Sequence, residues 1–266
     1  MPRLSIVIPA LNEYENMEAV LASIPARALQ EIGWTTEVIV VDNGSTDGTG
    51  DKARSLGARV VEQPVRGYGN AYRAGFSAAR GDVIATGDAD LTYPLDRLPE
   101  LLAEFQARGA DFMTTDRLLK ANRNAMKPSH TFGNHLLSMA ARTLFGHGFR
   151  DSQSGMWIFR RQVWTVIEVR SGGMAFSQEI KNEAYARGFR SVEVPIEYRP
   201  RGGTVKLNAL RDGWGNLRQL VEHRRRLRTV GTRRPAPAST LPPLQPSGPP
   251  ARLHPTGPID VRTPAP

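Results

Sequence analysis

Short runs rich in valine and isoleucine alternate with helix-like stretches over the first 115 residues, and this alternation limits the possible folds more than any other feature. Five runs have the composition of strands: Ser5–Ile8, Glu37–Val41, Arg59–Glu62, Val83–Thr86 and Phe112–Thr114. The stretches between them have helical spacing: Asn16–Ile24, Asp47–Ser55, Asn70–Ala79 and Leu98–Gln106. Strands joined through helices predict an α/β fold, a Rossmann-like, mostly parallel sheet flanked by helices on both faces. Ligands of such sheets bind beyond the carboxyl ends of the strands, so the residues that follow each strand are the candidates for a site.

The second half of the chain has a mixed pattern. We predict a helix at Thr131–Leu144, a strand at Trp157–Phe159, a helix at Ser177–Ala186 and a strand at Ser191–Pro195. A basic amphipathic helix is expected at Leu207–Arg228. Its apolar side is predicted to hold five residues: Leu210, Trp214, Leu217, Leu220 and Val221. We assign residues 1–230 to one domain. Residues 231–266 contain 11 of the 20 prolines and are predicted to form a disordered tail.

The positive charge of the chain is concentrated in one segment. Residues 199–234 hold 11 Lys and Arg against two acidic residues, an excess of nine, whereas residues 1–198 carry a net charge of about −1.

The absence of cysteine excludes disulfides and thiolate metal sites. No apolar run approaches the roughly 18 residues of a membrane-spanning helix. We therefore expect a cytoplasmic protein that is soluble or associates peripherally with the inner face of the membrane.

Two carboxylates follow the fourth predicted strand. Asp88 and Asp90 flank Ala89, and carboxylates this close repel one another unless a positive charge lies between them. Mg²⁺ or Mn²⁺ would serve, because such ions bind one or two carboxylates together with water and diphosphate oxygens. The same spacing equally fits a polar turn in which Asp90 or Thr92 caps the next helix.

Other polar residues also follow predicted strands. Asp42 could accept hydrogen bonds from a nucleobase or could bond to its own loop. Asp47 is expected to cap the next helix. The turn containing Gly67 and Gly69 would allow close approach of a ligand to the backbone, although the glycine spacings of dehydrogenases and P-loop enzymes are absent.

Several of these segments together resemble the family-2 glycosyltransferases of GT-A fold, most closely the branch that transfers mannose or glucose to polyprenol phosphates such as dolichol phosphate. The resemblance covers roughly residues 4–223. It rests on six segments in the expected order: Ile8-Pro9-Ala10-Leu11-Asn12-Glu13, Val41-Asp42-Asn43-Gly44-Ser45-Thr46-Asp47-Gly48-Thr49, Gly67-Tyr68-Gly69-Asn70-Ala71, Asp88-Ala89-Asp90-Leu91-Thr92-Tyr93-Pro94, Arg150-Asp151-Ser152-Gln153-Ser154-Gly155, and Arg199-Pro200-Arg201 leading to Lys206-Leu207-Asn208.

This resemblance implies roles for individual residues. Asp88 and Asp90 would hold the metal, while Thr92 stands where some relatives have a metal-contacting glutamine. The donor nucleotide and its diphosphate would contact Pro9, Leu11, Glu13, Asp42, Gly44, Gly69, Asp88, Ala89, Asp90, Arg201 and Lys206. Arg117 matches an arginine that binds an acceptor phosphate, with a solvated loop arginine as the alternative. Asp151 lies where relatives approach the donor sugar. Glu179 stands where many family members have a general base, with an exposed helix carboxylate as the alternative.

The implied reaction is metal-dependent transfer of a hexosyl group, with inversion, from a donor of the GDP-mannose or UDP-glucose type to polyprenyl phosphate. A soluble small-molecule acceptor is the first alternative, in which case Asp151 or Glu179 would act as the base. A sugar nucleotidyltransferase is disfavoured because the first strand is followed by Ala10-Leu11-Asn12-Glu13 rather than a glycine-rich loop bearing Arg and Lys. A non-catalytic nucleic-acid binder is disfavoured because the arginine-rich segment lacks interleaved aromatic residues, so we expect no nucleic-acid partner. The basic helix at residues 207–228 could lie on an anionic membrane surface or could cover the domain.

Overall fold

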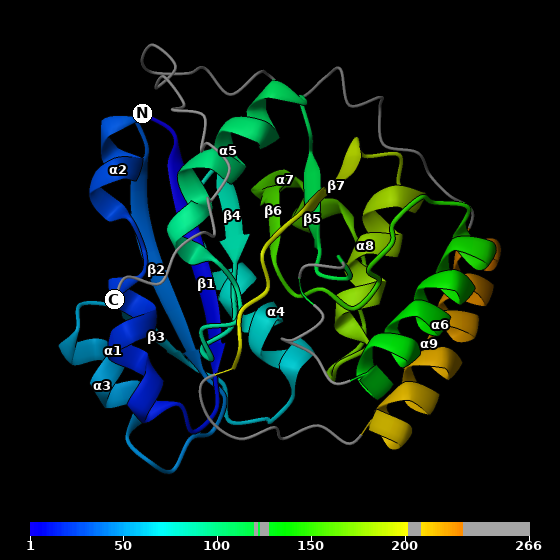
Figure 1. Cartoon of the computed structure of the whole chain (residues 1–266), viewed down its shortest axis with the longest axis horizontal. Coiled ribbons are helices and arrows are strands. Elements are labelled where there is room, and N and C mark those ends of the chain that lie inside the picture. The colour runs from blue at the N-terminus through cyan, green and yellow to red at the C-terminus, as the bar shows by residue number, and fades with distance from the viewer. Residues whose placement is uncertain (120–121, 123–127, 202–208, 231–266) are drawn as a thin grey trace, which may run out of the picture.

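The computed structural model describes residues 1–119, 122, 128–201 and 209–230. Its centre is one sheet of seven strands in the order β3-β2-β1-β4-β6-β5-β7 (Figure 1). The strands are β1 (Arg3–Ala10), β2 (Thr35–Asp42), β3 (Arg59–Glu62), β4 (Val83–Thr86), β5 (Phe112–Asp116), β6 (Trp157–Arg160) and β7 (Ser191–Pro195). Neighbouring strands are parallel except on either side of β6, which runs antiparallel to both β4 and β5.

The reversal of β6 has a direct consequence for the position of a site. Because β6 runs against its neighbours, the residues that lead into it lie at the edge where β1, β2, β4 and β5 end. The segment 151–156 therefore joins the loops that follow the parallel strands. This edge thus collects residues from both halves of the chain.

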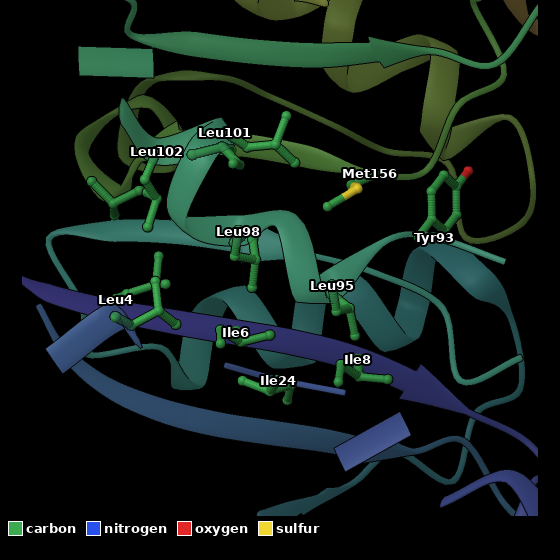
Figure 2. Close-up of a cluster of buried hydrophobic side chains, with 14 of the residues drawn as sticks. Leu4, Ile6, Ile8, Ile24, Tyr93, Leu95, Leu98, Leu101, Leu102 and Met156 are labelled. Atoms are coloured by element: carbon green, nitrogen blue, oxygen red, sulfur yellow. The ribbon is translucent and has the colours of Figure 1, made fainter. Parts of the chain in front are cut away.

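Helices cover both faces of the sheet because side chains alternate between them along each strand. On one face Leu4, Ile6 and Ile8 of β1 contact a core that includes Leu98 and Leu102 (Figure 2). The helices of this face are α1 (Tyr14–Ala22), α2 (Ala26–Glu31), α3 (Thr49–Ser55) and α5 (Leu98–Ala107), the last preceded by the 3₁₀ turn η1 (Leu95–Arg97).

The opposite face of the sheet carries an aromatic core. Tyr72 and Phe76 pack with Trp157 and Phe176, and all four side chains are buried. The helices here are α4 (Tyr68–Ala78), α7 (Arg161–Val166) and α8 (Phe176–Ala186). The helix α4 lies close to the strands because Gly75 faces Val7 and Val41, where a side chain would collide with them.

Two further helices, α6 (Pro128–Phe145) and α9 (Ala209–Val230), lie side by side at the β7 end of the sheet (Figure 1). They share a small apolar cluster that includes Leu137, Ala141, Leu220 and Leu227. No helix in the described ranges is both long and apolar enough to cross a membrane.

The predicted apolar side of the last helix is wrong in part. Trp214 is 73% exposed and Val221 is 37% exposed, whereas Leu220 is fully buried. The inner face also buries Asn216 and His223 because their polar atoms bond to Gln153 and Glu183, at 3.0 Å in each case. The prediction counted only apolar residues, so it did not place Asn216 and His223 on the buried face of the helix.

The predicted α/β architecture is otherwise confirmed. All seven predicted strands are present, whereas the short helices α2, α7 and η1 were not predicted. The predicted tail at residues 231–266 and the expected helix start at residues 207–208 lie outside the described residues.

We expect Gly75→Ala to lower the free energy of unfolding by about 1–3 kcal/mol, because the added methyl group overpacks the interface between α4 and the sheet. Its Cβ would lie 2.4 Å from Val7 Cγ1 and 2.9 Å from Val41 Cγ2. Urea unfolding followed by circular dichroism measures the change. Gly215→Ala is the matched control, since a Cβ there meets nothing within 4 Å. That control should leave stability unchanged or raise it by up to about 1 kcal/mol; equal losses in both variants would contradict the packing argument.

Candidate active site

The loop after β4 holds Asp90 in a fixed orientation. Asp90 is buried, and its Oδ1 accepts hydrogen bonds from the backbone N–H of Thr92 at 3.1 Å and from the Thr92 hydroxyl at 2.6 Å. Leu91 between them has a φ of 65°, a left-handed conformation that a leucine adopts only under local constraint. Thr92 therefore bonds to the Asp90 carboxylate and fixes which of its oxygens faces outward.

Asp88 lies against two tyrosines of α4. The hydroxyls of Tyr68 and Tyr72 donate to its Oδ1 at 3.3 and 3.2 Å. Burial and the nearby charge of Asp90 raise the pKa of Asp88 to about 7, although the Tyr72 hydrogen bond and two arginines act against the rise. The sequence analysis missed both tyrosines, although their i, i+4 spacing in the segment Tyr68-Gly69-Asn70-Ala71-Tyr72 places them on one face of the helix.

Arg201 links the loops after β1 and β4. Its Nη1 lies 3.3 Å from Asp90 Oδ2, and its Nη2 lies 3.7 Å from Glu13 Oε1. Glu13 is held in place by its backbone N–H, which donates to Thr49 Oγ1, and by Asn16, which donates to Glu13 Oε2. Three residues predicted to contact the donor nucleotide, its diphosphate or the metal are thus brought together, while Lys206 lies outside the described residues.

The donor set suits a hard divalent cation. Among the described residues no group of three or more His, Asp and Glu side chains is arranged to hold a metal by itself. Two carboxylates nevertheless match an Mg²⁺ or Mn²⁺ site that takes its other ligands from water and a diphosphate. The Arg201 guanidinium already places a cation against Asp90, so the structure shows that this carboxylate accepts a positive partner.

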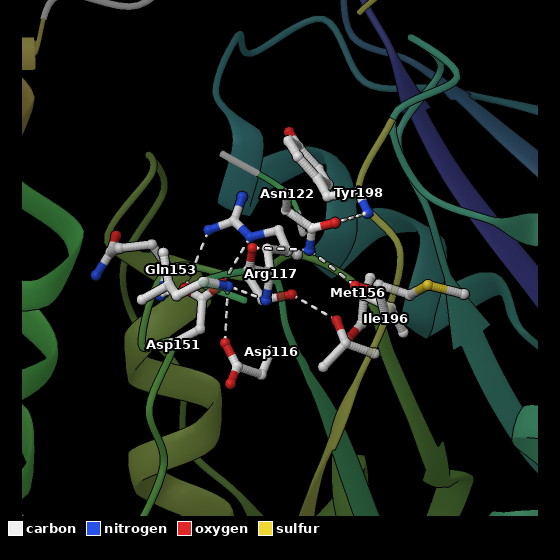
Figure 3. A network of polar contacts seen from close by, with 12 residues as sticks. Asp116, Arg117, Asn122, Asp151, Gln153, Met156, Ile196 and Tyr198 are labelled. Carbon is white, nitrogen blue, oxygen red and sulfur yellow. Dashed lines mark hydrogen bonds and ion pairs between the residues drawn. The ribbon is translucent and has the colours of Figure 1, made fainter. Parts of the chain in front are cut away.

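A buried ion pair joins the end of β5 to the segment before β6. Arg117 Nε donates to Asp151 Oδ2 at 2.7 Å and Arg117 Nη2 donates to Oδ1 at 3.0 Å, with the Arg117 backbone N–H adding a third bond (Figure 3). Burial by itself would raise the pKa of Asp151, but the Arg117 charge and hydrogen bonds bring it below the usual value. The solvated-loop alternative for Arg117 is wrong, since the side chain is buried.

The ion pair is itself held by residues that the sequence analysis missed. The Tyr198 ring lies beneath the Arg117 guanidinium at 5.2 Å, and the Asn122 side chain donates to the Arg117 carbonyl at 2.9 Å. Lys181 of α8 donates to the Asp151 carbonyl at 2.6 Å, and burial lowers the pKa of Lys181 to about 8. Nothing in the sequence around Lys181 indicates that its side chain is buried against the Asp151 carbonyl.

The loop after β2 forms the other end of the same edge. Asp42 is buried, and its Oδ1 accepts the Ser45 backbone N–H at 2.8 Å. This is the bond to its own loop that was predicted as the alternative to a nucleobase contact. Its Oδ2 takes no part in that bond. Gly50 of α3 faces this carboxylate, because a Cβ there would lie 2.5 Å from Asp42 Oδ2. Gly44 follows with a φ of 80°. Pro9 pairs with Val41 one residue before β1 ends at Ala10, and Leu11 follows the strand, so both lie at this edge. Ala89 is buried between Asp88 and Asp90.

Two predicted residues lie in protein contacts of a different kind. A Cβ on Gly69 would meet the Ser171 carbonyl at 2.2 Å, so this glycine allows close approach of another protein segment. Glu179 is buried, and its carboxylate accepts the Ser171 N–H at 2.8 Å and Arg226 Nη2 at 2.8 Å. The exposed-carboxylate alternative for Glu179 is therefore wrong, and its base role stays a prediction.

The sheet order and the helices on its two faces correspond to the GT-A fold. The structure is similar to glucosyl-3-phosphoglycerate synthase from Mycobacterium tuberculosis, with a TM-score of 0.64 and 26% identity over 86% of this chain and 79% of that chain. That crystal structure is a complex with Mn²⁺, uridine diphosphate and phosphoglyceric acid.

The chain belongs to glycosyl transferase family 2, whose sequence profile matches residues 5–166. It is 39% identical to the low-salt glycan biosynthesis hexosyltransferase Agl6 of Haloferax volcanii over 83% of this chain, and it spans only about half (53%) of that relative. It is 35% identical to the dolichyl-phosphate hexose transferase of the same organism, covering 82% of this chain and 92% of the relative.

We expect Asp151→Asn to lower the free energy of unfolding at pH 7 by about 3–5 kcal/mol, because it leaves Arg117 buried without its counter-charge. The folded-state pKa of Asp151 lies below the unfolded value, so its stabilisation is present above about pH 4 and is lost as the pH falls further. The gap between wild type and variant should therefore narrow in acid, as measured by urea unfolding from pH 3 to pH 7. Asp51→Asn, which removes an exposed pair with Arg54, is the control and should change little. A gap that stays constant down to pH 3 would contradict the proposed charge state.

Proposed function

We propose that the protein transfers a hexosyl group from a nucleoside-diphosphate sugar to a polyprenyl phosphate, with a divalent cation and with inversion at the anomeric carbon. In this reaction an oxygen of the acceptor phosphate forms a bond to the anomeric carbon while the nucleoside diphosphate leaves. The main support is the position of Asp88, Asp90, Glu13 and Arg201 at one edge of the sheet, beside the buried Arg117–Asp151 pair. The relatives that transfer hexose in glycan biosynthesis or to dolichyl phosphate agree with this proposal.

The donor would extend along the strand ends from Asp42 toward Asp90. Asp42 has an oxygen available for the N–H groups of a nucleobase, and its loop is tied to the next one because Asn43 Nδ2 donates to the carbonyls of Gln63 and Val65. Asp88 and Asp90 would hold the cation, which when bound neutralises charge on the leaving diphosphate. Arg201 would supply a further positive charge to the same diphosphate.

The charge state of Asp151 favours an acceptor that needs no base. A phosphate monoester has a second pKa near 6 and is therefore largely dianionic at pH 7, already a nucleophile. Asp151, by contrast, is a weak base because Arg117 occupies both of its oxygens. Arg117 would position the acceptor phosphate through Nη1, the nitrogen that lies outside this bidentate pair (Figure 3).

A soluble phosphorylated acceptor is the second candidate. It is favoured by the similarity to a synthase whose crystal structure holds phosphoglyceric acid. Both candidates bring a phosphate to the same cationic residues, but only the polyprenyl phosphate carries an apolar chain.

A surface on α6 and α9 favours the lipid candidate. The outer face of α6 exposes Phe132, Leu136 and Met139, at 73%, 51% and 53%, although its inner face already packs on α9. Trp214 of α9 is equally exposed. A helix that is apolar on two sides and packs on the basic helix α9 is suited to the interface of an anionic membrane, where a polyprenyl chain would be held.

We expect Asp90→Asn to reduce transfer at least about 100-fold, because the cation would lose a charged ligand. Transfer is measured across UDP- and GDP-sugars with Mn²⁺, using a short polyprenyl phosphate, the matching free alcohol and 3-phosphoglycerate as acceptors. The polyprenyl phosphate should be used and the alcohol should not.

Asp51→Asn, which changes the same residue type on an exposed part of α3, should retain full activity in this assay. Use of 3-phosphoglycerate alone would favour the second candidate. Equal use of the alcohol and the phosphate, or full activity of Asp90→Asn, would contradict the proposal.

We expect the protein to bind vesicles that contain phosphatidylglycerol more tightly than neutral vesicles, and added salt should weaken the binding. Leu136→Glu and Trp214→Glu should each reduce partitioning at least about tenfold, since each removes an apolar contact worth about 1.5–3 kcal/mol. Sedimentation with vesicles measures the bound fraction. Leu56→Glu at the end of α3, on the opposite side of the molecule, is the control (Figure 1). An equal effect of all three substitutions would contradict a specific surface.

A further inference from the structure

Arg201 occupies the outward-facing oxygen of Asp90. Thr92 takes Oδ1 through two hydrogen bonds, and the Arg201 guanidinium lies against Oδ2 at 3.3 Å. The same guanidinium reaches Glu13 Oε1 at 3.7 Å, so it balances carboxylates that follow two different strands. The one oxygen of Asp90 that could bind a cation therefore already has a cation beside it.

The contacts of Arg201 are those of a partner that can be displaced. Its two ion-pair distances are longer than the 2.7 and 3.0 Å of the buried Arg117–Asp151 pair. Its side chain is partly exposed, and within the described residues its Nε is buried without a hydrogen-bond partner. A buried donor without a partner costs free energy, so this arrangement holds Arg201 less firmly than a bidentate pair would.

We propose that Arg201 is the internal counter-ion of Asp90 in the donor-free protein and that a divalent cation binds by displacing it. The released guanidinium then pairs with the diphosphate that arrives with the cation. This inference rests on the proposed metal role of Asp88 and Asp90.

A consequence for binding follows from charge balance. A divalent cation alone must displace Arg201 from Asp90 and leave it with the longer, 3.7 Å contact to Glu13, so the cation binds weakly. A cation that arrives with a nucleoside diphosphate supplies a new anion for Arg201, so it binds more tightly. Arg201 thereby couples the two ligands, and the coupling is reciprocal because each ligand must change the affinity for the other by the same factor.

The test measures Mn²⁺ binding to the full chain by electron paramagnetic resonance of the free ion, without nucleotide and with saturating UDP or GDP. Arg201→Gln should bind Mn²⁺ alone at least about fivefold more tightly than wild type. The gain in Mn²⁺ affinity on adding nucleotide should shrink by a similar factor. Arg201→Lys keeps the charge and should lie between the two.

Arg199→Gln is the matched control. Arg199 lies two residues before Arg201 and pairs with Asp96, so this substitution removes the same charge without changing the contacts of Asp90. It should bind Mn²⁺ as wild type does. Equal Mn²⁺ affinity in wild type and Arg201→Gln, or equal tightening by Arg199→Gln, would overturn the counter-ion role. In either of these two cases the proposed metal site would still stand, provided that wild type binds Mn²⁺ with nucleotide and Asp90→Asn does not. Absence of Mn²⁺ binding in every variant, with and without nucleotide, would overturn both.

Discussion

The buried ion pair between Arg117 and Asp151 is the contact on which the acceptor side of this edge depends. It joins the end of β5 to the segment before β6, two regions 34 residues apart, and Lys181 fastens α8 to the same point. Glu193 of β7 adds a further constraint, since its carboxylate accepts the backbone N–H groups of Arg150 and Asp151. A charge pair removed from water is stable only when its remaining polar atoms are satisfied, and here four elements share that task.

The antiparallel direction of β6 makes this pair possible. Were β6 parallel to β4, the segment that leads into it would lie at the opposite edge of the sheet, away from Arg117. Thr86 of β4 secures the observed arrangement, because its hydroxyl donates to the Gly155 carbonyl and accepts the Trp157 N–H, both at 2.8 Å. The reversal thus brings the second half of the chain to the strand ends that carry Glu13, Asp42 and Asp90.

Much of this arrangement could be predicted from the sequence, and the rest has identifiable reasons. Strands and their polar ends follow from local composition, so the edge that holds Asp42, Asp88 and Asp90 was predictable. The partners of Arg117 were not, because a contact across 34 residues leaves no periodic signal. The orientation of α9 was predicted wrongly for a related reason: Asn216 and His223 are buried through specific hydrogen bonds, which a pattern of apolar residues does not register.

Four carboxylates predicted for the site fall into two groups, and the difference between them bears on the chemistry. Asp151 and Glu179 each have both carboxylate oxygens engaged by donors from the protein, which makes them poor proton acceptors. Asp88 and Asp90 differ, since among the described residues hydroxyl and backbone donors hold one oxygen of each, and the other oxygen of Asp90 meets a loosely held arginine. Asp88 and Asp90 are thus placed for a cation, whereas the oxygens of Asp151 and Glu179 are already taken by protein donors. That distribution suits an acceptor that arrives already ionised better than a hydroxyl that must first be deprotonated.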